Sequence, residues 1–295
     1  MAIDPRGIVP ALVTPFRPDE SVNLPVLNEL LEHVLAAGVH GVFVLGSQGE
    51  YFAMEPEEKK AVIETTLDAV KGRVPVYAGT GATTTREAIA LTKMAEDAGA
   101  DAVSVITPAF INPNQIEMYE HYRAIAASTR LPVLLYANPA RTGNHLPVAL
   151  VTRLAAVDNV VGIKDSSGDL ATTAAYINAT PPSFRVFAGR DTLVLGTLLY
   201  GGAGSVAATG NVAPGLLVQV FESWQRGDLE TARATQAQLA RLRDTFSLGT
   251  FPAVIKEALG MIGIDAGPCR RPVGGLSPDS RNQLREVLDS LHLIP

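Results

Sequence analysis

The sequence predicts an α/β fold, a (β/α)8 TIM barrel followed by a C-terminal helical extension. Short apolar, β-branched runs alternate with longer amphipathic segments from near the start to about Arg226, and eight such pairs can be counted. This alternation is typical of parallel strands joined by helical crossovers, and eight strand-helix pairs can close into a barrel. Beyond Arg226 only helical patterns follow, which predicts the extension.

Each expected strand is a short apolar run that ends near glycine, proline or a polar residue. In chain order the strands are expected at 7–15, 41–46, 74–80, 102–108, 132–139, 160–166, 184–190 and 204–209. The segments between them carry helix signals. Pro56 precedes two glutamates, and the segment from Thr84 to Ala98 ends before Gly99. Proline and acidic residues in the first turn, and glycine after the last, are typical of helix ends.

The extension is expected to hold three helices, at 229–246, 252–261 and 277–291. No linker rich in proline, serine or charge separates the barrel, residues 1–226, from the extension, residues 227–295, so we expect one compact unit. The uncharged stretch 192–221 contains six glycines and Pro214. A buried strand with its turns explains this stretch better than a membrane-spanning helix.

Composition narrows the class of function. The 295 residues are 47% hydrophobic, and 24 basic against 30 acidic side chains give a net charge of -6 without a basic block. A nucleic-acid footprint is therefore missing, and small-molecule chemistry is favoured. The single cysteine, Cys269, fits a reducing compartment. Together with the absence of a signal-peptide pattern, this predicts a cytoplasmic protein.

The chemistry of such a barrel lies where the strands end, and Lys164 is the most informative residue there. Of six lysines, only Lys164 terminates a run expected to be buried on both sides. Burial disfavours the ammonium form and leaves free amine for carbonyl addition and Schiff-base formation. The alternative is a lysine that extends from the strand end into water. Position alone leaves both interpretations open.

Tyr136 closes the preceding apolar run, and Arg141 follows it. The Tyr136 phenol could meet Lys164 and move protons, although position alone favours an ordinary core tyrosine. Arg141 lies in a proline-containing loop, where its guanidinium could hold a substrate carboxylate or remain solvated. The loop from Gly46 to Glu50 offers backbone amides and the Ser47 hydroxyl to a carboxylate, although the motif alone is weak.

Two other kinds of catalysis are disfavoured. The five histidines show neither paired nor HxxxH spacing, so no metal site is expected. No GxSxG motif appears, which argues against a serine hydrolase of that type. The mechanism is therefore expected to depend on Lys164.

Several motifs, taken in order, resemble those of the dihydrodipicolinate synthase and N-acetylneuraminate lyase family. They are GIVPALVTPF at the start, GSQGE after the second strand, AGTGA, ITP, YANPARTG after the fifth strand, GIKDSSGD at the sixth, and GPCRRP near Cys269. The resemblance covers nearly the whole chain. It implies a pyruvate-dependent class I aldolase or lyase with a barrel and C-terminal helices, and dimers paired into tetramers.

The resemblance also implies roles for individual residues. Lys164 would form an imine with pyruvate, Tyr136 would move protons, and no cofactor would be needed because the protonated imine is the electron sink. Ser47 and Gln48 would hold the pyruvate carboxylate. The wider expected substrate-binding set is Arg141, Ser167, Gly189, Asp191 and Val206.

The sequence also departs from the synthase pattern. Ser47-Gln48 stands where a Thr-Thr pair is usual, so the hydroxyl link to the tyrosine is expected to be altered at Gln48. Ala109-Phe110 replaces two tyrosines, and Phe110 has no hydroxyl to relay a proton. Arg141 matches the arginine that binds the carboxylate of the aldehyde substrate. These features predict an enzyme that prefers aldehydes bearing a carboxylate. Condensation with aspartate semialdehyde is expected to be present but not clearly the best reaction.

Two alternatives stay open. One is an aldolase or dehydratase acting on a 2-keto-3-deoxy sugar acid or 4-hydroxy-2-oxoglutarate, with Asp191 and Ser167 binding acceptor hydroxyls. The other, from a different class, is a catalytically silent keto-acid sensor. The expected partners are a keto acid, an aldehyde and further copies of the chain, with no nucleic acid and no membrane.

Overall fold

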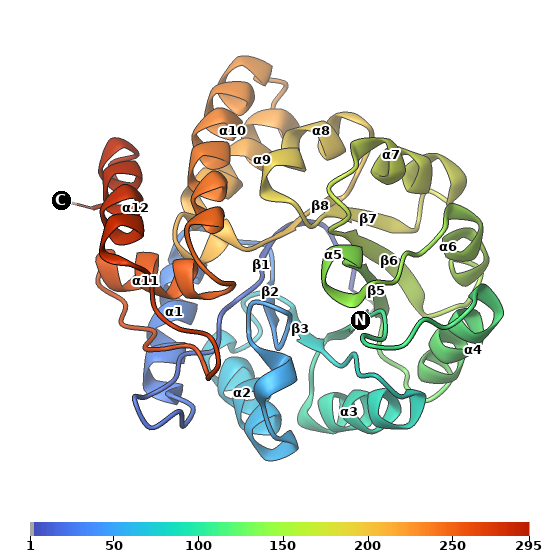
Figure 1. Cartoon of the computed structure of the whole chain (residues 1–295). Helices are drawn as coiled ribbons and strands as arrows, with labels where there is room; N and C mark the ends of the chain where they lie inside the picture. Colours follow the sequence, from blue (N-terminus) through green and yellow to red (C-terminus); the bar gives the residue numbers. More distant parts are fainter. Residues whose placement is uncertain (1–2, 295) are drawn as a thin grey trace.

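The computed structural model describes residues 3–294, in which eight parallel strands form one sheet. The strand order is β1-β8-β7-β6-β5-β4-β3-β2, and a parallel bridge between Ala11 and Phe43 joins β1 to β2 (Figure 1). The predicted barrel is therefore confirmed. Its strands are β1 (Gly7–Pro10), β2 (Val42–Val44), β3 (Val76–Gly79), β4 (Ala102–Ile106), β5 (Val133–Ala137), β6 (Val160–Asp165), β7 (Arg185–Ala188) and β8 (Gly204–Ala207).

Helices surround the strands on the outside of the barrel (Figure 1). They are α1 (Leu24–Ala36), α2 (Pro56–Val70), α3 (Thr85–Ala98), α4 (Gln115–Ala126), α6 (Val148–Leu154), α7 (Leu170–Ala179), α8 (Val194–Leu199) and α9 (Pro214–Gln225). A one-turn helix, α5 (Pro139–Thr142), follows β5 where the sequence predicted a loop. Pro139 at its first position and Gly143 in the left-handed region after it explain why the chain makes a single helical turn there.

The helix-end signals act as predicted. The Thr84 side chain accepts a hydrogen bond from the Glu87 N–H at the start of α3, and Gly99 ends that helix with φ +96°. The strands are shorter than expected. β1, for example, ends at Pro10 although the apolar run continues to 15. Beyond Pro10, single contacts with the neighbouring strands follow, such as the bridge between Ala11 and Phe43.

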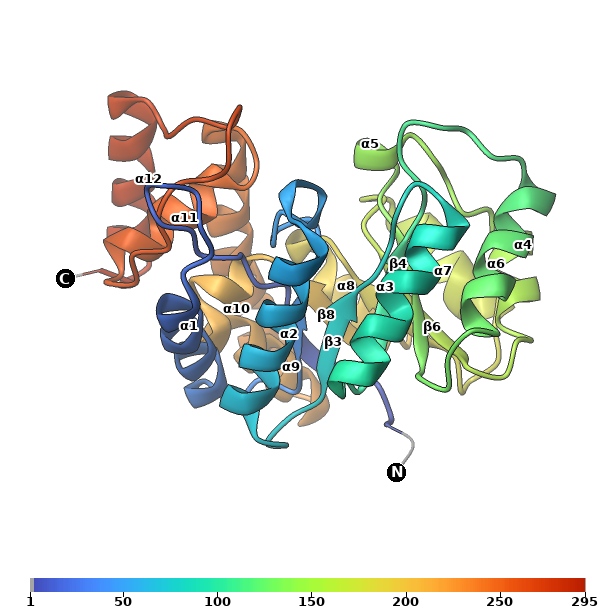
Figure 2. The ribbon, with the colours of Figure 1, turned by 90° about the horizontal axis from the view of Figure 1, so that it is seen from below.

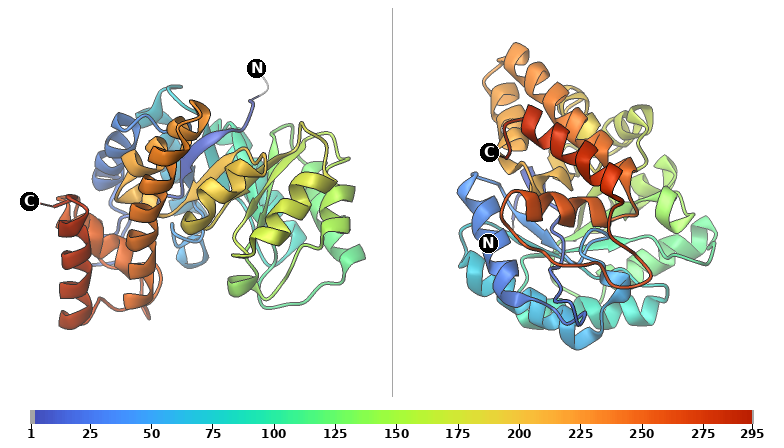
Figure 3. Two further views of the ribbon diagram at one scale, coloured as in Figure 1. Left: turned by 90° about the horizontal axis from the view of Figure 1, so that it is seen from above. Right: turned by 60° about the vertical axis from the view of Figure 1, so that its left-hand side comes forward.

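Beyond α9 the chain forms α10 (Leu229–Asp244), α11 (Ala253–Met261) and α12 (Pro278–Ser290). These helices lie at one side of the barrel, with α10 alongside α9 (Figures 1 and 3). The Gln236 side chain accepts from the Leu195 N–H at 2.9 Å and donates to the Asp191 carbonyl at 2.9 Å. α10 is thereby joined to the segment that follows β7.

The uncharged stretch 192–221 contains β8, as expected, but also α8 and most of α9. Most of its apolar residues pack in the core, whereas Leu199 and Tyr200 are exposed. In the described residues, no helix is both long and apolar enough to cross a membrane.

The core has two layers. Inside the barrel, alternate strand residues fill the interior, namely Val9, Ala11, Phe43, Tyr77, Ala102, Leu134, Phe187 and Val206. A larger apolar layer lies between the strands and the helices. The N-terminus lies at the end of the barrel opposite α5 (Figure 2). Since α5 follows β5 directly, the carboxyl ends of the strands and α5 share one end of the barrel.

Candidate active site

Lys164 and Tyr136 are neighbours across β5 and β6. Strand register pairs Tyr136 with Lys164, and Lys164 with Phe187 on β7. Both Lys164 and Tyr136 are 4% exposed. The Lys164 Nζ lies 4.2 Å from the centre of the Tyr136 ring and 4.9 Å from that of Phe43. Lys164 therefore does not extend into water. Its amine lies among aromatic faces.

The burial of this pair changes its acid-base chemistry. Desolvation lowers the pKa of the Lys164 ammonium below the ordinary lysine value, although the adjacent Tyr136 opposes the shift. Burial alone would raise the pKa of the Tyr136 phenol. The Lys164 charge and hydrogen bonds from Ser47, Asn138 and Ser166 outweigh burial and lower it. Both pKa values are thus shifted downward together, which favours proton exchange between the amine and the phenol.

Two of these side chains lie within 3.3 Å of the Tyr136 hydroxyl. The Ser47 Oγ lies 3.3 Å away, and the Asn138 Nδ2 donates to the phenol oxygen at 3.0 Å. The structure corrects the expectation that the hydroxyl link is altered at Gln48. Ser47 makes the link, because its side chain reaches β5 while Gln48 lines the neighbouring cavity.

The loop from Gly46 to Glu50 is a tight turn at the end of β2. The Gly49 N–H donates to the Gly46 carbonyl at 3.0 Å, and the Thr14 hydroxyl donates to the Gly49 carbonyl at 2.7 Å. A side chain at position 46 would collide with the Phe43 ring, since a Cβ there would lie 2.5 Å from it. The turn brings Ser47 to the mouth of the barrel. The buried Gln48 Oε1 has no hydrogen-bond partner among the described residues.

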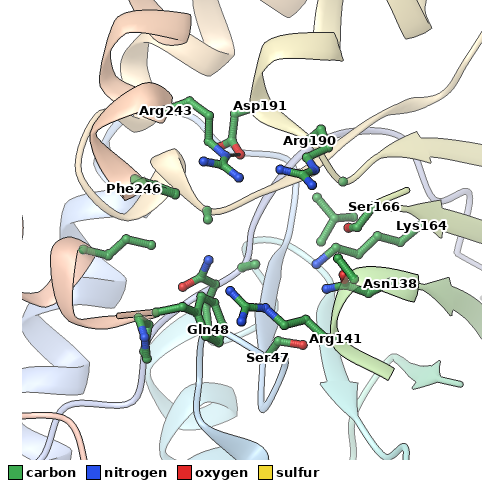
Figure 4. A pocket seen from close by; sticks show the side chains of 18 of the residues that line it. Ser47, Gln48, Asn138, Arg141, Lys164, Ser166, Arg190, Asp191, Arg243 and Phe246 are labelled. Carbon is green, nitrogen blue, oxygen red and sulfur yellow. Dashed lines mark ion pairs between the residues drawn. The ribbon is translucent and has the colours of Figure 1, made fainter. Parts of the chain in front are cut away.

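A cavity of about 370 Å³ opens above Lys164 (Figure 4). Strand ends of the barrel contribute one wall and the C-terminal extension contributes the other. The lining residues are Ala11, Ser47, Gln48, Tyr136, Asn138, Ala140, Arg141, Lys164, Ser166, Gly189, Arg190, Asp191, Val206, Ala208, Arg243, Phe246, Ser247, Phe251, Pro252, Val254 and Ile255. This volume suits a small organic acid and its reaction partner.

Three arginines line the cavity. The Arg141 guanidinium lies 4.3 Å from the centre of the Phe251 ring. Arg243 lies 4.7 Å from the Phe246 ring centre, and its Nε is 3.4 Å from Asp191 Oδ2. Burial lowers the pKa of Arg243, and the nearby charges of Arg190 and Arg141 add to that effect while Asp191 opposes it. The cavity is therefore strongly positive.

The predicted substrate-binding residues fall into three groups. Ser47, Gln48, Arg141, Gly189 and Val206 line the cavity together with Lys164 and Tyr136. Asp191 also lines it, but its Oδ1 accepts from the Thr209 N–H at 2.7 Å and the Thr209 hydroxyl at 2.6 Å. Ser167 does not line it.

Two of these placements have local causes. Gly189 is required where it stands, because a Cβ there would lie 2.0 Å from the Ser166 Oγ. Ser167 lies outside because successive strand side chains point to opposite faces, which puts Lys164 and Ser166 on the inner face. The Ser167 N–H instead donates to Asp165 Oδ1 at 2.9 Å.

The sequence reasoning missed several lining residues. Asn138 and Ser166 could have been found, since each lies two positions after a predicted site residue on the same strand face. The residues from the extension carried no such signal, because their approach to the barrel depends on helix packing. They are Arg243, Phe246, Ser247, Phe251, Pro252, Val254 and Ile255. Within residues 3–294, no group of three or more His, Cys, Asp or Glu side chains is arranged to hold a metal ion.

A desolvated lysine at the carboxyl end of a barrel strand, next to a phenol and below a positive cavity, defines the class of Schiff-base lyases. Comparison with known proteins agrees. Residues 4–291 match the model of the dihydrodipicolinate synthetase family, and the chain belongs to that family.

Individual relatives support this membership. The chain is 38% identical to a 4-hydroxy-tetrahydrodipicolinate synthase of Methanopyrus kandleri, covering 100% of this chain and 99% of the relative. It is 40% identical to an uncharacterized DapA-like lyase of Halobacterium salinarum, covering 98% and 95%.

Solved structures share the fold. Dihydrodipicolinate synthase DapA-2 of Bacillus anthracis superimposes with a TM-score of 0.95 at 34% identity over 100% of both chains. YagE of E. coli K12, a prophage protein of the dihydrodipicolinic acid synthase family solved in complex with pyruvate, has a TM-score of 0.94 at 36% identity. That match covers 98% of this chain and 99% of YagE.

Proposed function

We propose that the chain is a class I aldolase or lyase that uses pyruvate and forms an imine on Lys164. The placement of the Lys164 Nζ carries the proposal: it is buried below the cavity, 4.2 Å from the Tyr136 ring. Family membership and the pyruvate complex of YagE support the choice of keto acid.

The reaction follows from the positions of these two side chains. The Lys164 amine adds to the keto carbon of pyruvate, and the carbonyl oxygen leaves as water after Tyr136 has delivered protons to it. The protonated imine withdraws electrons from the methyl carbon, which loses a proton to the Tyr136 phenolate, and the adduct becomes an enamine. Tyr136 thereby regains the proton that the aldehyde oxygen needs in the next step. The enamine carbon attacks an aldehyde, whose oxygen takes up a proton. Water then hydrolyses the imine and restores the amine.

The pyruvate carboxylate is proposed to lie against the turn that carries Ser47 and Gln48. The turn presents backbone N–H groups, and the Ser47 hydroxyl links the carboxylate position to Tyr136. The mechanism requires no cofactor, because the imine itself accepts the electrons. Reversal of the same steps would cleave a carbon-carbon bond.

Arg141 is proposed to bind a carboxylate on the acceptor aldehyde. The flat face of its guanidinium lies on Phe251, which leaves its edge free for two parallel hydrogen bonds. The sugar-acid alternative is less well supported, because it depends on Asp191 and Ser167. The Asp191 carboxylate already accepts hydrogen bonds from Thr209 and pairs with Arg243. Ser167 does not line the cavity.

We further propose that the chain forms homo-oligomers and is located in the cytoplasm. Phe110, at the tip of the loop after β4, is 97% exposed, and Ile116 at the start of α4 is 70% exposed. A contiguous patch of exposed apolar side chains marks a surface that another chain covers, and we propose that these two side chains belong to such a patch. The single cysteine, Cys269, is a buried free thiol, which is consistent with a reducing compartment.

Deuterium exchange into pyruvate tests the proposed function without knowledge of the acceptor. In D2O, enamine formation should replace the methyl hydrogens of pyruvate with deuterium, which NMR detects. We expect enzyme-dependent exchange that is lost in Lys164→Met. A protein that binds pyruvate without exchanging its methyl hydrogens would be a silent sensor, and the proposal would be wrong.

A further inference from the structure

Arg190 is a cation that lines the cavity on the side opposite Arg141. It lies two residues after the end of β7, and its guanidinium lines the cavity (Figure 4). Within residues 3–294, neither Arg190 nor Arg141 forms an ion pair, and Arg243 uses Asp191. Gly168 makes room for this placement, since a Cβ there would lie 3.2 Å from the Arg190 Nε.

Basic side chains outnumber acidic ones around the cavity. Among residues 3–294, the cavity lining has the cations Arg141, Arg190 and Arg243 besides Lys164, and Asp191 as its one carboxylate. Asp191 already accepts two hydrogen bonds from Thr209 and faces Arg243, and it is 1% exposed. The cavity therefore offers free positive charge for anions and no free carboxylate for a cation.

From this arrangement we propose that Arg190 makes the enzyme select acceptors that carry a carboxylate and no ammonium group. This inference rests on the proposed function and names the substrate class of the same site. Arg190 and Arg243 lie on one side of the cavity, and Arg141 lies on the other (Figure 4). An α-amino acid aldehyde held by Arg141 would bring its ammonium, on the carbon next to the carboxylate, into the space between these cations. Like charges at short range in a desolvated site are strongly disfavoured.

Two aldehydes of equal chain length isolate the effect of the ammonium. Succinate semialdehyde and aspartate semialdehyde differ only in the amino group beside the carboxylate. The bond-forming step is the same for both, because the enamine carbon attacks the aldehyde carbon and a proton goes to the aldehyde oxygen. Any difference in kcat/KM therefore reports how the cavity accepts the ammonium.

The experiment measures kcat/KM for both aldehydes with pyruvate at about pH 7.5, because the amino group of aspartate semialdehyde is charged there. It uses the parent enzyme, Arg190→Gln, Arg190→Glu and the control Arg130→Gln. We expect the parent to prefer succinate semialdehyde by about ten-fold or more. The preference should fall in Arg190→Gln and fall further or reverse in Arg190→Glu. Arg130, whose side chain is 97% exposed, lies on the outer surface, so its variant should keep the parent ratio.

The ratio of kcat/KM for succinate semialdehyde to that for aspartate semialdehyde is taken within each variant, so a general loss of activity cancels. A parent ratio near or below one, or a ratio that does not change in the Arg190 variants, would overturn the inference. Pyruvate deuterium exchange is measured in the same samples. If the parent shows no exchange, the proposed function fails and this inference falls with it; if exchange is present, an unfavourable ratio refutes only the role of Arg190.

Discussion

The Lys256 Nζ lies 2.7 Å from Glu50 Oε1, and the two side chains are 2% and 1% exposed. Glu50 ends the turn that carries Ser47, and Lys256 belongs to α11 of the extension. The pair therefore joins the C-terminal helices to the turn proposed to hold pyruvate. Lys256 also donates to the Pro268 carbonyl at 2.8 Å. Lys256 is thus a buried lysine paired with a carboxylate, whereas the buried Lys164 lies next to a phenol.

Removal of one partner from the buried pair should destabilise the fold. Lys256→Met leaves the Glu50 charge buried and unpaired, which typically costs about 3–5 kcal/mol. We expect a large drop in the urea midpoint of unfolding for Lys256→Met. The double variant Glu50→Gln/Lys256→Met should drop by less than the sum of the drops in the two single variants. Lys60→Met is the control, since the Lys60–Glu64 pair is about half exposed and such pairs contribute only about 0–1 kcal/mol. Equal effects of Lys256→Met and Lys60→Met would contradict this role of the pair.

Tyr136→Phe should retain the fold and lose most of the turnover. The substitution removes only the hydroxyl, and general acid-base groups typically contribute about two to four orders of magnitude in rate. Turnover is measured by steady-state kinetics, and a thermal melt checks folding. A variant that turns over at the parent rate would show that the tyrosine serves only packing.

Imine formation should have a pH profile set by the lowered Lys164 pKa. The neutral amine is the nucleophile, so the rate rises as pH rises through this pKa and levels off once the amine is free. Because the pKa is lowered, the plateau should begin below the pH at which an ordinary lysine, with a pKa of about 10.4, loses its proton. The midpoint belongs to the coupled Lys164–Tyr136 pair.

A second variant checks the cause of that midpoint. Tyr136 raises the Lys164 pKa against the effect of burial, so Tyr136→Phe should move the midpoint to lower pH. The readout is the initial rate of borohydride-trapped adduct at each pH. A profile that still rises where free lysine titrates would contradict the desolvation argument.

Arg141→Ala should weaken the use of acid-bearing aldehydes selectively. Loss of a charge-assisted hydrogen-bonded pair costs about 1.5–3 kcal/mol, equivalent to roughly ten-fold to more than a hundred-fold in kcat/KM. Glyoxylate should show this loss, and glyceraldehyde, which has no carboxylate, should not. Arg141→Lys keeps the charge but lacks the planar guanidinium, so its kcat/KM for glyoxylate should lie between those of the parent enzyme and Arg141→Ala. A uniform loss across all aldehydes would mean that Arg141 supports the cavity without binding the acceptor.

The sequence predicted the barrel and its central pair because these depend on local pattern. Lys164 and Tyr136 end neighbouring apolar runs, and strand register brings such ends together. Arg243 could not be predicted in this way. It lies in the last turn of α10, where basic residues are common, and only packing of the extension turns it toward Asp191. The link from Ser47 to Tyr136 was missed because the family pattern drew attention to Gln48.

Reductive trapping tests the central claim most directly. The enzyme is incubated with pyruvate and borohydride, digested, and analysed by peptide mass spectrometry, with Lys164→Met as the control. We expect the reduced adduct on Lys164 in the parent enzyme and no adduct in the control. An adduct on another buried lysine, Lys256 or Lys59, or an adduct on no lysine would contradict the account.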